Sequence, residues 1–250
     1  MQLNYVRKPN GMYVLRKNDF DDIATMVLNE YMPNVLQSPQ AVDIEYLATE
    51  CLFLTISNKH ITYNGSILGM TAFGDVSINC YDNMLEPTQE NLLEGSMLLD
   101  NSLLGRDQFA RRRFTLSHEA SHWILHRSYH SPDNKQYQFR RQKLVVCRSV
   151  TVGCANHSFV TDEDWEEWQA DKLAAALLMP YTQFRMYSEY VLRSLREMFL
   201  IEGNYTANYS EAISIISSKF KVSKLAAKIR LKEVGLLRYP QRNRYNGYNA

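Results

Sequence analysis

Two histidines with a glutamate between them carry the clearest chemical signal in the chain. His118, Glu119 and His122 form the pattern His-Glu-x-x-His, and neither Pro nor Gly interrupts it. In a helix, residues four apart lie on one face, so both imidazoles can reach one metal ion, and imidazole nitrogen suits zinc. Glu119 is then placed to act as a general base toward a water molecule at the metal. The pattern predicts a zinc site on a helix.

A catalytic zinc site needs a third protein ligand and an open position. The metzincin arrangement, with a third His after a Gly turn, is excluded because no Gly follows His122 closely. His126 shares the helix face, but it lies about 12 Å of helix rise from His118. We therefore expect His126 to pack or to support a ligand, rather than to bind the ion.

The better third ligand lies in the acidic helical pattern downstream. Glu167 and Asp171 are four residues apart, so Glu167 can complete the site while Asp171 accepts the free N–H of a ligand histidine. Glu163 and Glu166 compete with Glu167. Glu163 falls in the first helical turn, where the helix dipole alone favours an acidic residue, and Glu166 points about 100° away. The ordinary alternative is a solvated acidic face.

Taken together, these two segments resemble the ImmA/IrrE family of metallo-endopeptidases. The matching runs are HEASHWILH at residues 118–126 and EWQADKLAAALLMP at residues 167–180, and the resemblance covers about residues 18–237. It implies that His118, His122 and Glu167 bind Zn²⁺, that Glu119 is catalytic, and that Asp171 supports a ligand. A long basic segment at residues 127–158 departs from the family.

The resemblance also implies a role. Family members commonly act in the bacterial cytoplasm, where they cleave a helix-turn-helix repressor and so switch on mobile-element transfer or a stress response. We therefore expect regulatory proteolysis of such a protein substrate. The alternative is a DNA-binding or toxin–antitoxin regulator whose zincin fold is not catalytic, although the intact Glu119 argues against a purely structural site.

The elements around the motifs predict an α+β, zincin-like metallopeptidase with a small mixed sheet and an active-site helix. Helices are expected at residues 18–31, 42–51, 106–126 and 161–178, the last with Thr161 as N-cap, and then onward to about 237 with a turn near 203–209. Four apolar runs between residues 52 and 100 read as strands, with a turn at Asn64-Gly65. We divide the chain into an N-terminal extension (1–17), a peptidase domain (18–190), a helical helix-turn-helix-like subdomain (191–237) and a basic tail (238–250).

The C-terminal part is strongly basic. Residues 219–250 hold 9 basic and 1 acidic side chain, a net charge of +8, and Lys224, Lys228 and Lys232 repeat along one helix face. Ser223 and Gly235 are natural start and stop signals for that helix. We favour a packed helical subdomain or a protein-docking surface, and expect DNA binding to be weak and non-specific at most.

Other candidates carry weaker signals. Cys147, Cys154 and His157 have no recognised zinc spacing, so ordinary thiols are the default. The run SMLLD at residues 96–100 is either a free strand edge for a peptide or an interior strand. Several side chains are candidates to stabilise an oxyanion, and the sequence does not choose among them: Arg127, Tyr129, His130, His157 and Tyr181.

Composition fits a folded protein. Hydrophobic residues make up 45% and charged residues 22% of the 250, which excludes a wholly disordered chain. No apolar run approaches the length of a membrane span, and no secretory signal is evident, so we expect no membrane association. Four cysteines without a Cys-x-x-Cys pair indicate reduced thiols and a cytoplasmic protein.

Overall fold

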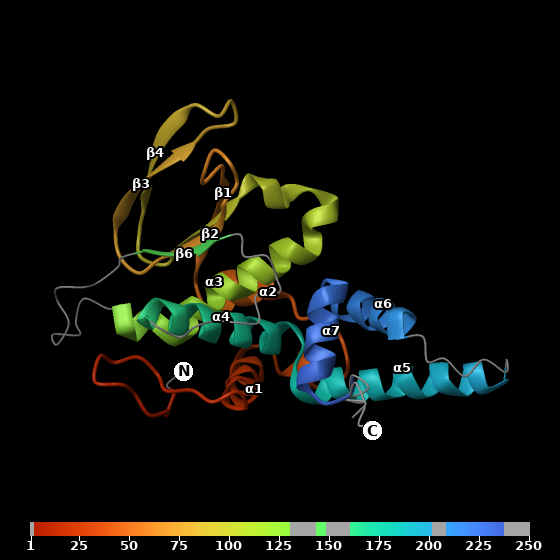
Figure 1. Ribbon diagram of the computed structural model, residues 1–250. Coiled ribbons are helices and arrows are strands. Elements are labelled where there is room, and N and C mark those ends of the chain that lie inside the picture. The colour runs from red at the N-terminus through yellow and green to blue at the C-terminus, as the bar shows by residue number, and fades with distance from the viewer. Residues whose placement is uncertain (1–2, 131–143, 149–160, 202–208, 238–250) are drawn as a thin grey trace, which may run out of the picture.

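Helix α3 (Phe109–His130), which carries the His-Glu-x-x-His motif, lies at the centre of the fold. In the computed structural model, which describes residues 3–130, 144–148, 161–201 and 209–237, α3 packs on strand β2 and on helix α4 (Asp162–Leu178). Helix α1 (Asp19–Tyr31) covers α4 in turn. The layers therefore follow the order sheet, α3, α4 and α1 (Figure 1).

The helices follow the apolar spacing and the capping residues of the sequence. The buried stripe of α1 includes Phe20, Ile23 and Val27, at helical spacing. Thr161 caps α4 through a capping box with Asp164, as its type predicted. The expected helices at residues 18–31, 42–51 and 161–178 are confirmed. The second is α2 (Ile44–Tyr46) followed by a π-turn at Leu47–Cys51, and 3₁₀ turns lie at Pro33–Leu36, Asn101–Leu104 and Arg106–Gln108.

A four-stranded mixed sheet lies against α3, in the strand order β1-β5-β2-β6. Its strands are β1 (Thr55–Lys59), β2 (Ile67–Ala72), β5 (Ser96–Asp100) and β6 (Leu144–Arg148). Strand β5 pairs parallel with β1 and antiparallel with β2, and β6 pairs antiparallel with β2. The run SMLLD is therefore an interior strand, and the alternative of a free edge at β5 is wrong.

Two strands lie where the sequence predicted none. Strand β4 (Pro87–Leu92) pairs with β3 (Val76–Tyr81) in a separate hairpin, but most of its residues are exposed, so it shows no apolar run. Strand β6 falls in the basic stretch that was expected to be irregular. Both form by pairing with another strand, β3 for β4 and the distant β2 for β6, rather than through their own periodicity.

The C-terminal helices join the main core. Helices α5 (Tyr181–Ile201), α6 (Tyr209–Phe220) and α7 (Lys224–Glu233) follow one another, and α6 lies along α5 (Figure 1). Ser223 caps α7 and Gly235 follows it with a positive φ of 77°, as predicted. Buried residues of α6 and α7 belong to the same apolar cluster as those of α1 and α4. The domain boundaries, and a DNA-binding role for α6 and α7, stay predictions.

The N-terminal segment packs on the central helices. An isolated bridge pairs Arg7 with Tyr13, and Leu3, Tyr13 and Leu15 are buried in the main core. Lys8 and Asn10 both donate to Asp162 at the start of α4, at 2.9 and 2.6 Å. The segment before α1 is thus held against α4. Within the described ranges, no helix combines the length and the apolarity that crossing a bilayer requires.

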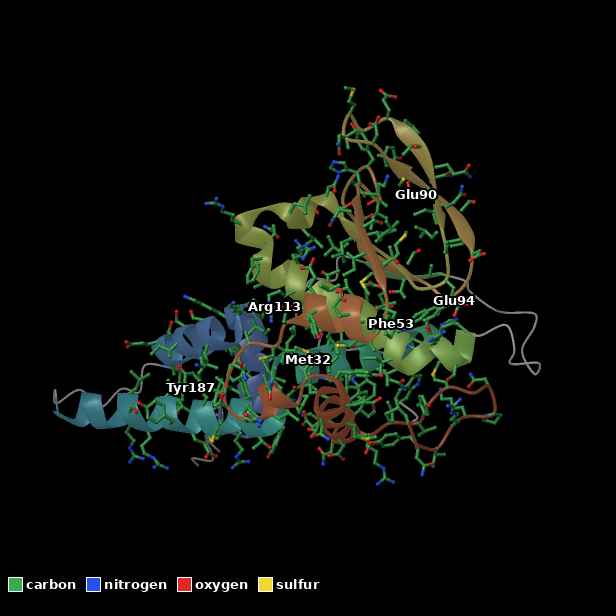
Figure 2. All side chains as sticks on the ribbon, turned by 180° about the vertical axis from the view of Figure 1, so that it is seen from behind. Met32, Phe53, Glu90, Glu94, Arg113 and Tyr187 are labelled. Carbon is green, nitrogen blue, oxygen red and sulfur yellow. The ribbon has the colours of Figure 1, made fainter. Side chains whose placement is uncertain are left out.

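A buried arginine of α3 holds the α6–α7 turn. Arg113 is 8% exposed and donates to the carbonyls of Lys221 (3.1 Å) and Val42 (2.8 Å). Lys221 has a positive φ of 52°, which is unfavourable for a residue with a Cβ. Figure 2 shows Arg113 where α3 meets the C-terminal helices. The guanidinium stabilises this turn.

We expect Arg113→Leu to lower the free energy of unfolding by roughly 2–4 kcal/mol, because two buried carbonyls lose their donor. Urea unfolding in excess chelator measures this without any contribution from metal binding. The neighbouring Arg112→Leu is the control. Arg112 pairs with Glu45, whose side chain is 56% exposed, so its loss should cost less than about 1 kcal/mol. Equal losses would contradict the assignment.

Candidate metal centre

Three donor side chains from α3 and α4 face one another. The Nε2 atoms of His118 and His122 lie 2.9 Å apart, and the Glu167 carboxylate lies 3.3 Å from the first and 3.4 Å from the second. Ligands at about 2.0–2.1 Å from a tetrahedral zinc ion are about 3.3 Å apart. The three groups therefore have the spacing of metal ligands around a common point.

Each histidine of this group has a second partner behind it. His118 Nδ1 lies 2.9 Å from Asp171 Oδ1, the contact that the sequence predicted for Asp171. A carboxylate only accepts, so His118 carries its proton on Nδ1 and leaves Nε2 free to bind a metal. His122 Nδ1 lies 3.0 Å from His126 Nδ1, and His126 Nε2 lies 3.1 Å from Gln169 Oε1. The structure thus places His126 behind a candidate ligand rather than among the ligands.

Glu119 follows His118 on α3 and is completely buried, and its carboxylate interacts electrostatically with both candidate histidine ligands. Its Oε2 accepts a hydrogen bond of 2.6 Å from Thr71 on β2, while its Oε1 has no hydrogen-bond partner among the described residues. Burial raises the pKa of Glu119, and His118, His122 and Thr71 oppose that rise. A carboxylate held by one oxygen and open at the other suits a general base.

Strand β2 approaches Glu119 closely at a glycine. A Cβ at position 69 would lie 2.6 Å from Glu119 Oε1 and 2.9 Å from a methyl group of Thr115. Only Gly69 leaves room for the carboxylate there. A glycine inside an apolar strand signals close approach of another group, so this residue could have been found from the sequence; Thr71 gave no such signal.

The Glu167 carboxylate forms the accessible side of the group. Its side chain is 32% exposed, against 2% for His118 and 0% for His122. Burial alone would raise the pKa of Glu167, but its interactions with His118 and His122 outweigh burial and hold the pKa below its usual range. The carboxylate is therefore ionised, as a metal ligand must be.

The competing glutamates lie elsewhere. Glu166 is buried on His130, with its carboxylate 3.2 Å from His130 Nε2, and Glu163 is exposed in the first turn of α4. A second set of potential donors is formed by His122, His126 and Glu166. The facing Nδ1 atoms of the two histidines bond to each other, and Glu166 bonds to His130, so the members of this set already have other partners.

Most of the candidate oxyanion donors contact other partners in the structure. His130 bonds to Glu166, Arg127 pairs with Glu94 at 3.2 Å, and Tyr181 accepts from Arg185. The ring of Tyr129 packs edge-on against His130. His157 and Cys154 lie outside the described residues, so the expectation of ordinary thiols there stays a prediction.

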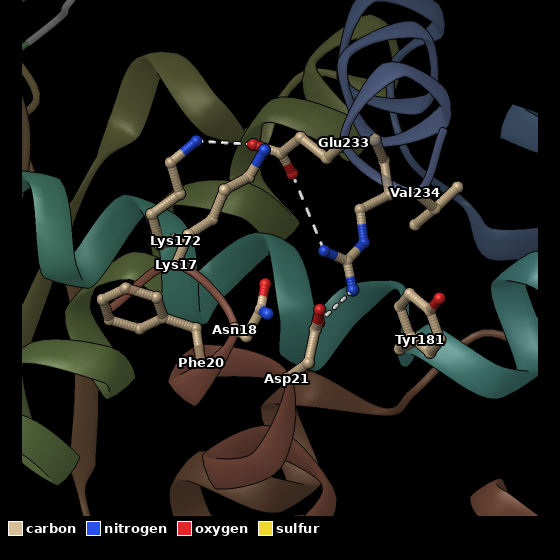
Figure 3. A pocket seen from close by; sticks show the side chains of 9 residues that line it. Lys17, Asn18, Phe20, Asp21, Lys172, Tyr181, Glu233 and Val234 are labelled. Carbon is tan, nitrogen blue, oxygen red and sulfur yellow. Dashed lines mark hydrogen bonds and ion pairs between the residues drawn. The ribbon is translucent and has the colours of Figure 1, made fainter. Parts of the chain in front are cut away.

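A cavity of about 140 Å³ lies apart from this group, between α1, α4, α5 and α7 (Figure 3). Its charged side chains pair across it: Arg230 donates to Asp21, and Lys172 lies 2.5 Å from Glu233. Arg230 also donates to the Met179 carbonyl at the end of α4. None of the His/Glu group lines the cavity. The ion pairs across it join α7 to α1 and α4.

Comparison with known families agrees with this site. The family described as IrrE N-terminal-like domain, peptidase family M78, matches residues 105–232. A comparison with curated proteins finds no match. The matched range includes the whole of α3 and α4, which supply every candidate ligand. Because the match covers just over half of the chain, the protein belongs to the IrrE-like M78 family of metallopeptidases.

Proposed function

We propose that the protein is a zinc-dependent endopeptidase. One observation carries the proposal: three ligand atoms converge beside a buried glutamate whose Oε1 has no partner among the described residues. Two imidazoles and one carboxylate match the ligand set of catalytic zinc sites that keep one position open. A purely structural site would give no use for an open, buried carboxylate oxygen at this place.

The residues divide the chemistry among them. His118, His122 and Glu167 would hold the ion, which when bound polarises the scissile carbonyl and lowers the pKa of water. Glu119 accepts the proton of the attacking water at Oε1 while Thr71 holds Oε2. The same carboxyl then gives that proton to the leaving amine as the peptide C–N bond breaks.

The substrate we propose is a helix-turn-helix repressor, cleaved in the cytoplasm. The resemblance of both motifs to the ImmA/IrrE family supports this choice. Helix α7 offers a docking face, because Lys224 and Lys232 are exposed and Lys228 is half-buried on it. Lysines contact phosphate or acidic groups without reading a sequence, which favours a protein-docking role over specific DNA recognition.

Purified protein should carry about one zinc ion per chain, removable by chelator. His118→Ala and His122→Ala should abolish binding, and Glu167→Ala should weaken it greatly, because each removes one convergent ligand. Metal analysis after dialysis measures the content. Glu163→Ala is the matched control, since that carboxylate lies on the same helix but is exposed and outside the ligand group. Full zinc occupancy in Glu167→Ala would show that the third ligand is wrong.

Glu119→Gln should keep the fold and the zinc but lose cleavage of the cognate repressor. Glutamine retains the size and can still bond to Thr71, but it cannot accept and return a proton. We expect a fall of at least about 100-fold in kcat, measured by the appearance of repressor fragments. Cleavage close to the wild-type rate would mean that another group acts as the base.

Replacing Lys224, Lys228 and Lys232 together with Glu tests the docking face. Reversing the charge should impair cleavage of the repressor while zinc content stays unchanged, because α7 contributes no ligand to the metal centre. DNA binding should be weak, salt-sensitive and independent of sequence in the wild type. A tight, sequence-selective DNA complex at physiological salt, lost in the triple variant, would favour the DNA-binding regulator instead.

A further inference from the structure

We propose that the backbone carbonyl of Tyr13, together with Gln169 and His126, forms a one-way hydrogen-bond relay that presents His122 Nε2 to the metal. The inference rests on the proposed function, since it assigns positioning residues to one of its zinc ligands. Gln169 Nε2 lies 2.8 Å from the Tyr13 carbonyl, and the relay continues through His126 to His122 Nδ1.

The direction of the relay follows from its last acceptor. A backbone carbonyl can only accept, so Gln169 must turn its NH₂ group toward Tyr13 and its oxygen toward His126. His126 must then carry its proton on Nε2, which leaves Nδ1 as an acceptor. His122 must therefore donate from Nδ1, and its Nε2 keeps the lone pair that a metal ligand needs.

Burial fixes the direction of the hydrogen bonds in the relay. His122 and His126 are 0% exposed and Gln169 is 1% exposed. Water is therefore not at hand to satisfy a reversed bond, and a reversed bond would set two acceptors or two donors against each other. The alternative tautomer of His122 would break one of the three bonds of the relay, and that of His126 would break two.

The N-terminal segment fixes the carbonyl that sets this direction. Arg7 donates to the Tyr13 hydroxyl at 2.6 Å and lies over its ring. Lys8 and Asn10 hold the same segment to Asp162 at the start of α4. The residues before α1, expected to be only an extension, therefore reach the metal centre through the backbone.

The two candidate histidine ligands are oriented by different chemistry. His118 donates to Asp171, a carboxylate whose side chain is 42% exposed and so remains hydrated. A charged partner behind the completely buried His122 would lack that hydration and would cost free energy. An uncharged relay that ends on the main chain supplies the orientation without a buried charge.

The test measures zinc affinity of the full-length chain by competition with a chromophoric chelator. His126→Leu removes the acceptor for His122, and Gln169→Met removes both bonds of Gln169 at similar volume. Each should weaken zinc binding by roughly 10- to 100-fold. His126→Asn should restore most of the affinity, because its amide oxygen can accept near the position of Nδ1.

Gln183→Met is the matched control. Gln183 is also buried and donates to a backbone carbonyl, that of Leu36, but it belongs to α5 and lies outside the relay. It should lower the melting temperature of the zinc-free protein as Gln169→Met does, yet leave zinc affinity unchanged. A merely structural role for Gln169 would move both variants alike.

The outcomes separate this inference from the proposed function. Two results would overturn the relay while leaving the zinc site intact. In the first, Gln169→Met binds zinc as tightly as Gln183→Met. In the second, His126→Asn binds zinc no more tightly than His126→Leu. Absence of zinc binding in the wild type, or its persistence in His118→Ala, would overturn the proposed function itself. If His126→Leu does not fold, the Gln169→Met and Gln183→Met pair still decides.

Discussion

Helix α3 buries polar side chains around the candidate metal centre, and three of them bond to a partner on another element. His118 meets Asp171, Glu119 meets Thr71, and His126 meets Gln169. An unpaired buried polar group costs about 1–3 kcal/mol, so the fold needs these hydrogen-bond partners as much as it needs its apolar contacts. The requirement explains why α4 lies along α3 and why β2 crosses it at Gly69: both place polar atoms or space where α3 needs them.

Local signals in the sequence were sufficient for the helices and for the ligand group. Spacings of four residues on two helices brought His118, His122 and Glu167 together as expected, and Thr161, Ser223 and Gly235 marked helix ends correctly. The rest of the site depends on contacts between distant residues. Thr71 lies 48 residues from Glu119, and the Tyr13 carbonyl lies 156 residues from Gln169. No periodicity encodes such pairs, and for the same reason strand β6 was missed.

Part of the basic C-terminal charge lies inside the fold. Arg230 belongs to this charge run, but it is buried, donates to Asp21 and to the Met179 carbonyl, and so ties α7 to α1 and α4. Arg113 of α3 likewise ties the α6–α7 turn to the fold. Lys224, by contrast, is exposed on α7. A count of charge therefore overstates the surface potential, because some of the cations hold the fold together.

The acceptor at the end of the relay is a main-chain atom, and this has a consequence for how the protein can vary. No side-chain replacement at position 13 removes that carbonyl, but one that loses the buried Tyr13 ring or its bond from Arg7 would release the segment that holds it. The carbonyl is placed instead by the turn at residues 9–11, in which Gly11 has a positive φ of 91° and donates to the Lys8 carbonyl. The candidate metal centre thus depends on the path of the N-terminal backbone, which this turn and the buried Tyr13 side chain set together.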